Sequence, residues 1–146
     1  TINIANVRKM RARIYGYQNA VWMVNQDCYP QLAALGETTA GSNAAVFQPS
    51  ISMGDPDMLL GRPIIYDENM STLGDAGDIM LINWSEYLEG TWGGQTFDES
   101  IHVRFAAHER AFRFNVYNAG QPWWRTALTP KNSASTLSPF VALAAR

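Results

Sequence analysis

The residues of this chain best suited to metal binding or acid–base catalysis are His102, His108 and Glu109. A metal site on a helix needs two histidines three or four positions apart, so that both face the same ion. Here the two histidines are six positions apart and flank an expected strand break. The spacing predicts hydrogen-bonded or solvent-facing histidines and no metal site.

Nucleophilic catalysis has equally little support. Cys28 lies near an expected helix start, which can lower a thiol pKa, but neither histidine is near it in sequence. A buried structural cysteine is the better interpretation. The chain has no Gly-x-Ser-x-Gly elbow, and glycine-rich residues 90–94 lack the Lys-Ser/Thr that follows a phosphate-binding loop. We therefore predict no catalytic residue and no cofactor.

Charged clusters remain to be explained. Calcium loops need a regular array of oxygen ligands closed by a glutamate, and the loop aspartates show no such array; turn formation explains them better. These aspartates are Asp55, Asp57, Asp75 and Asp78. A basic cluster near the start suggests contact with DNA phosphates or an acidic neighbour, but a solvated helix face is the favoured interpretation. It comprises Arg8, Lys9, Arg11 and Arg13. The net charge of -2 argues against a dedicated nucleic-acid or anionic-membrane binder.

The first half of the chain alternates short helices and apolar strands. Helical spacing predicts a helix over 2–14, and a second helix capped by Asn25 or Asp27 runs to about Leu35. Residues 20–24 and 79–82 are apolar at successive positions, which predicts central strands covered on both faces, the second of them over 78–83. A further strand is expected at 62–66. Residues 37–57 are expected to be mostly loop, with a short strand at 45–48.

The second half has a different pattern. A helical turn is expected at 84–88, and residues 90–94 are flexible by composition. Alternation at 102–105 and 112–117 predicts half-exposed strands, with a turn at 118–120 and a last strand at 140–144. The whole pattern is α+β, a central sheet covered by helices with a more exposed hairpin near the C-terminus.

Three strings in order carry a resemblance to a known family. Residues 59–66 read LLGRPIIY, residues 74–87 read GDAGDIMLINWSEY, and residues 90–94 read GTWGG. They resemble the major capsid proteins of tailed bacteriophages, the Hong Kong 97-type family, in which an LLG-x-P strand precedes a GD-apolar strand, an aromatic-S-x-Y helical turn and a glycine-rich arm. Residues 101–112 resemble the late HVRF segment of the same family.

The resemblance implies a fold and a domain division. It implies a Hong Kong 97-like capsid fold, with the end of the spine helix at 1–14 and the axial-domain core at 15–100. A peripheral-domain strand segment is expected at 101–120, and a C-terminal strand returns to the axial domain at 121–146. The chain is expected to be a C-terminal piece of a longer protein, and alone to be a monomer or small ring.

The implied function is structural. The resemblance implies a subunit of an icosahedral phage or prophage capsid, which self-assembles into pentamers and hexamers around double-stranded DNA. Scaffold and portal proteins are the further expected partners, a membrane is not, and the expected location is the virion, assembled in the bacterial cytoplasm. An encapsulin, a cellular shell around cargo enzymes, remains an alternative, as does a small hydrolase or binding domain with an unrecognised site.

Six residues are expected to make contacts between subunits. A bulky ring in a flexible loop has little local core to enter, so Trp92 is expected to meet a neighbour, together with the glycines beside it. In the family the loops of the axial domain line the symmetry axes, so three aspartates in the expected axial loops are also predicted to make contacts between subunits. The set is Trp92, Gly93, Gly94, Asp55, Asp57 and Asp75.

Overall fold

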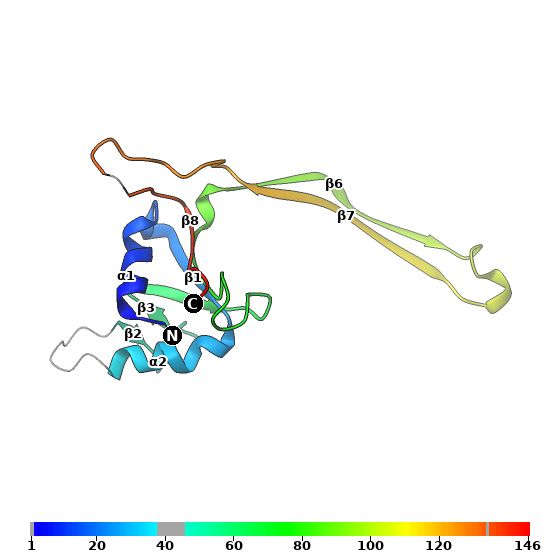
Figure 1. The fold of residues 1–146 in the computed structure, drawn as a ribbon. Coiled ribbons are helices and arrows are strands. Elements are labelled where there is room, and N and C mark those ends of the chain that lie inside the picture. Colours follow the sequence, from blue (N-terminus) through cyan, green and yellow to red (C-terminus); the bar gives the residue numbers. More distant parts are fainter. Residues whose placement is uncertain (1, 38–45, 134) are drawn as a thin grey trace. The chain divides into compact units, whose positions relative to one another are not determined.

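The computed structural model describes residues 2–37, 46–133 and 135–146 (Figure 1). The chain forms two compact units. The sheet unit comprises Thr1–Glu86 and Trp124–Arg146, and the hairpin unit comprises Tyr87–Trp123. This division falls at other positions than the expected domain boundaries, and the assignment to axial and peripheral domains stays a prediction.

The sheet unit contains two α-helices and six strands among its described residues, with 3-10 turns between them. The helices are α1 (Ile4–Arg13) and α2 (Tyr29–Glu37). The strands are β1 (Ala20–Val24), β2 (Phe47–Gln48), β3 (Met58–Leu59), β4 (Arg62–Tyr66), β5 (Ile79–Asn83) and β8 (Phe140–Ala142). The 3-10 turns are Tyr17–Asn19, Gln26–Cys28 and Trp84–Glu86. These elements confirm both expected helices and the strands at 20–24, 62–66, 78–83 and 140–144, within one or two residues at most ends.

The strands form one mixed sheet in the order β2-β3-β4-β1-β5-β8. Among the strands that the structure describes, β1 and β4 form the one parallel pair. β1 also pairs antiparallel with β5, which places Trp22 opposite Leu81. The two segments expected to form central strands therefore lie side by side in the sheet. This position gives each of them a hydrogen-bonded neighbour on both edges.

Both helices and one face of this sheet share a single core. Fully buried Trp22, Leu81, Val7 of α1 and Leu32 of α2 belong to the same cluster. The opposite face is less covered, because Met23 and Met80 are only half-buried and Ile65 is 48% exposed. The central strands are nevertheless not exposed on this face: Ile82 of β5 is 4% exposed there, no residue of β1 or β5 is in the exposed range, and Ile65 belongs to the neighbouring strand β4. The expectation that the central strands are covered on both faces is therefore met fully on the first face and in part on this one.

Local signals explain how the elements begin and turn. Asn3 caps α1 through the Ala5 N–H at 3.0 Å, and Asn25 accepts from the Asp27 N–H at 2.9 Å. Leu60 and Gly61 both have positive φ, 50° and 77°, between the paired residues Leu59 and Arg62. A two-residue turn with two left-handed positions matches the twist of an antiparallel pair, which explains the glycine in this motif.

The hairpin unit differs most from the sequence-based expectations. It consists of β6 (Tyr87–Ser100) and β7 (Ala111–Pro122), joined by a loop with a 3-10 turn at Phe105–Ala107. Residues expected to be flexible (90–94) and to form a turn (118–120) lie inside these strands, and the strand expected at 102–105 is loop. The cross-strand register, not local composition, sets this structure: Gly90 pairs with Ala119 and Thr91 with Asn118.

No helix among the described residues has the length and apolarity needed to cross a bilayer.

Candidate assembly surface

One face of the hairpin carries a cluster of exposed phenylalanines. Phe97 lies directly opposite Phe114, and its ring centroid is 5.0 Å from that of Phe114 and 5.8 Å from that of Phe112. Side chains alternate between the faces of a strand, so Val116 lies on the same face. The exposed fractions are 56% for Phe97 and Phe112, 65% for Phe114 and 64% for Val116. We call these four residues the phenylalanine face.

Charged side chains occupy the other face and the loop end. Asp98 lies opposite Arg113, and the Arg113 guanidinium donates to its carboxylate at 2.6 Å. The Asp98 carboxylate raises the pKa of Arg113, which therefore stays protonated. Two further exposed pairs, Arg110–Glu99 at 2.7 Å and Arg104–Glu109 at 3.0 Å, lie at the loop end. Exposed ion pairs of this kind add little stability each.

The hairpin therefore buries almost nothing by itself. Both strands are fully described, and no side chain of β6 or β7 is buried. A two-stranded hairpin alone is marginally stable in water, and a large exposed apolar patch normally marks a protein–protein contact. The patch continues into the connecting loop, where Val103 is 73% and Phe105 74% exposed. An exposed apolar surface of this kind is typical of a protein–protein contact.

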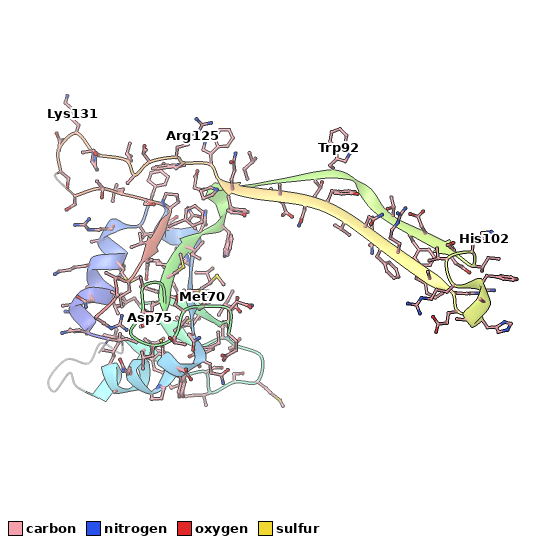
Figure 2. The ribbon with its side chains drawn as sticks, turned by 45° about the vertical axis from the view of Figure 1, so that its right-hand side comes forward. Met70, Asp75, Trp92, His102, Arg125 and Lys131 are labelled. Atoms are coloured by element: carbon pink, nitrogen blue, oxygen red, sulfur yellow. The ribbon has the colours of Figure 1, made fainter. Side chains whose placement is uncertain are left out.

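Three of the predicted contact residues lie on this hairpin. Trp92, 81% exposed, pairs with Tyr117, and Figure 2 shows its ring pointing away from the strands. The register shifts between Trp92 and Thr96, and Gly93 has a φ of 66°. A bulge that uses a glycine with positive φ explains Gly93, and nothing lies within 4 Å of a side chain built at Gly94. The role of these three residues between subunits stays a prediction.

The three predicted aspartates lie in the sheet unit and are not equivalent. Asp57 accepts two hydrogen bonds, from the Ser50 N–H at 2.7 Å and the Tyr66 hydroxyl at 2.8 Å. Asp75 accepts from the Thr72 hydroxyl at 2.9 Å within its own turn. Asp55 is exposed. Asp57 and Asp75 thus have a local structural role, and an additional contact role for all three stays a prediction.

Sequence reasoning did not find the phenylalanine face as a unit. It placed Phe112, Phe114 and Val116 on one side of a strand, but the partner strand with Phe97 was hidden by the glycines around Trp92. Only the pairing of residues far apart in sequence brings the rings together. Residues 96–100 contain one apolar residue, Phe97, so the sequence carries no alternation that marks them as the partner strand.

The other charged candidates are dispersed. Among the described residues, no group of three His, Cys, Asp or Glu side chains could hold a metal ion. His108 has a positive φ of 55° in the hairpin loop, and Figure 2 shows His102 at the same end of the hairpin unit. The basic cluster of α1 is exposed. Cys28 is fully buried, and burial together with the nearby Asp78 charge raises its pKa to about 11, which makes it unreactive at neutral pH.

Residues 1–130 match the Phage capsid family. The chain belongs to the phage capsid family. The sheet unit and the hairpin unit are therefore parts of a structural protein of a capsid, and the expected membership is confirmed. No match to the chain was found among curated proteins.

A solved structure agrees with this membership. The fold of this capsid-family chain is similar to that of a chain described as "Capsid of empty GTA particle computed with C5 symmetry", with a TM-score of 0.57 and 15% sequence identity. The match covers 82% of this chain and 40% of that chain, so this chain spans less than half of its length. At this identity the likeness shows the fold alone, and it confirms the expected α+β capsid fold.

Proposed function

We propose that this chain is part of a shell subunit that self-assembles into pentamers and hexamers and encloses double-stranded DNA in an icosahedral capsid. The observation that carries the proposal is the phenylalanine face. Within the described chain this face is exposed, and a neighbouring subunit is a partner that every capsid protein meets. Family membership and the capsid-like fold support the same conclusion.

The proposal assigns different tasks to the two units. The sheet unit has a continuous core and acts as the rigid body of the subunit. The hairpin unit has long strands and little core, so in this proposal it acts as a clamp whose apolar face a neighbouring subunit covers. Many such contacts between different patches of identical subunits close into a shell when the rotation between neighbours closes.

The partners and the location follow from this function. We propose that scaffold and portal proteins take part in assembly, that assembly occurs in the cytoplasm of a bacterial host, and that the final location is the virion. The interface includes Trp92 and its neighbouring glycines on the hairpin, and the loops that carry Asp55, Asp57 and Asp75 on the sheet unit.

Negative-stain electron microscopy of the full-length gene product tests the proposal. We expect closed uniform particles or regular hexamer sheets, with nucleic acid in particles purified from infected or induced cells. Dispersed monomers across a range of salt and protein concentrations would refute self-assembly. Particles that hold an enzyme in place of nucleic acid would identify a cellular cargo shell instead.

A further inference from the structure

We propose that a hollow in the sheet unit binds an arginine side chain from a second copy of this chain, and that α1 of that copy supplies it. The inference rests on the proposed function, because it requires that copies of the chain meet. The hollow measures about 440 Å³ and is lined by Gln26, Tyr29, Pro30, Asp57 and Tyr66.

The hollow contains one fixed negative charge. The Tyr66 hydroxyl donates to one oxygen of Asp57, and the Ser50 N–H donates to the other, at 2.8 and 2.7 Å. Burial, and next the hydrogen bond and charge of Asp57, raise the pKa of Tyr66, so the phenol keeps its proton. Each carboxylate oxygen has a second lone pair, so Asp57 can accept further donors.

Aromatic side chains form the walls of the hollow. The Tyr29 ring lies 6.1 Å from the Tyr66 ring at 60°, and 5.8 Å from the Phe47 ring at 82°. Two tilted tyrosine rings beside a carboxylate attract a cation to the ring faces and to the acid together. A guanidinium suits this site better than an ammonium, because it is planar, stacks on aromatic rings and donates two parallel hydrogen bonds to a carboxylate.

The described part of the subunit does not supply this cation itself. Its ion pairs join Arg104, Arg110, Arg113 and Arg146 to other acids, and none of them involves Asp57. Asp57 is therefore an anion in an aromatic hollow whose natural counter-ion is external to the described chain. Asp78 differs from Asp57 in this respect, because its carboxylate forms an ion pair with the Arg146 guanidinium at 2.7 Å.

The helix α1 offers the complementary charge. Its sequence IANVRKMRAR contains basic residues and no acidic one. Arg11 stacks over Tyr17 of its own subunit, 4.6 Å from the ring centroid. The exposed Arg8 and Arg13 form no described side-chain hydrogen bond or ion pair, so they are the available donors. A hollow on one copy and a helix on the next make a head-to-tail contact, the type that generates rings.

A binding experiment tests the chemistry of the hollow without assembly. N-acetyl-arginine methylamide is titrated into the unassembled chain and followed by NMR at Tyr29 and Tyr66, with the uncharged citrulline analogue as ligand control. We expect arginine-specific shifts that weaken about tenfold or more in Asp57→Asn, since a hydrogen bond to a charged group contributes about 1.5–3 kcal/mol. The matched control Asp55→Asn removes the same charge two positions away and should bind as wild type. Equal shifts with the citrulline analogue, or equal binding by Asp57→Asn, would overturn the proposal.

A charge swap in the full-length gene product tests the partner. Asp57→Arg should reduce particle yield, and so should the one of Arg8→Asp and Arg13→Asp that removes the inserted arginine; combining Asp57→Arg with that helix change should restore the yield. Circular dichroism checks that every variant is folded. If arginine binds but neither combination restores particles, the second copy is overturned as the source of the arginine. If the wild-type protein forms no particles, the proposed function fails, while the NMR result still decides the chemistry of the hollow.

Discussion

Replacing Phe114 by serine should disrupt assembly without unfolding the subunit. Phe114 lies opposite Phe97 and is 65% exposed. An aromatic side chain offers about 200 Å² of surface, so roughly 130 Å² of this one remains for a neighbour to cover. At about 25 cal/mol per Å², covering it stabilises each intersubunit contact by about 3 kcal/mol. Losing that amount weakens a single contact about 100-fold.

Two measurements separate assembly from folding. Particle yield and the critical protein concentration are followed by sedimentation and electron microscopy, and urea unfolding is followed by circular dichroism. We expect Phe114→Ser to lose particles and to keep the urea midpoint of the wild type, because an exposed ring contributes little to the core. Asn115→Ser is the matched control, since Asn115 is the next residue of β7 and faces the other side of the hairpin. A wild-type particle yield and critical concentration for Phe114→Ser would refute the role of the phenylalanine face.

Two further predictions concern the sheet unit. Arg146→Met should lower the free energy of unfolding by about 3–5 kcal/mol, because it leaves the Asp78 carboxylate, whose side chain is 0% exposed, without its ion-pair partner. Urea denaturation measures the loss, with the exposed Arg125→Met as control. A loss below about 1 kcal/mol for Arg146→Met would contradict the reasoning. Cys28 should make the protein less stable at alkaline pH. The pKa of its thiol is about 11 in the folded state, above the ordinary value of 9.0, so the folded state keeps the proton to higher pH than the unfolded state. The stabilising contribution is complete below pH 9.0 and is lost as the pH rises to about 11. The loss is about 3 kcal/mol, and a Cys28→Ala protein with the same pH dependence of unfolding as wild type would exclude this cause.

Local patterns predicted the sheet unit well. Residues 20–24 and 79–82 are short apolar runs bounded by polar residues. Asn25 caps the 3-10 turn that precedes α2 through its side-chain oxygen, and its amide also donates to the Met70 carbonyl. Such signals act within a few residues, so tertiary structure rarely overrides them. The weaker burial of Met23 and Met80 on the second face could not be predicted, because it depends on which other parts of the chain pack there.

The hairpin shows the limit of local reasoning. Gly90, Gly93 and Gly94 weaken the strand signal of β6, and Gly120 imitates a turn in β7. In the folded chain Tyr87 lies where a side chain at position 120 would stand, so the glycine there serves cross-strand packing and not a turn. The pairing of β6 with β7 is stabilised by contacts between residues far apart in sequence, such as Tyr87 and Pro122, and a short stretch of sequence does not contain both partners.

The sequence by itself determined the family of this protein, its central strands and the residue types available for contact. Only the tertiary structure decided which of these residues act together. It brought Phe97 next to the phenylalanines of β7, placed Asp57 in the same hollow as Tyr29 and Tyr66, and paired Asp78 with Arg146. The physical reason is that charge and apolarity belong to single residues, whereas a surface or a hollow requires residues distant in sequence to be brought within a few ångströms.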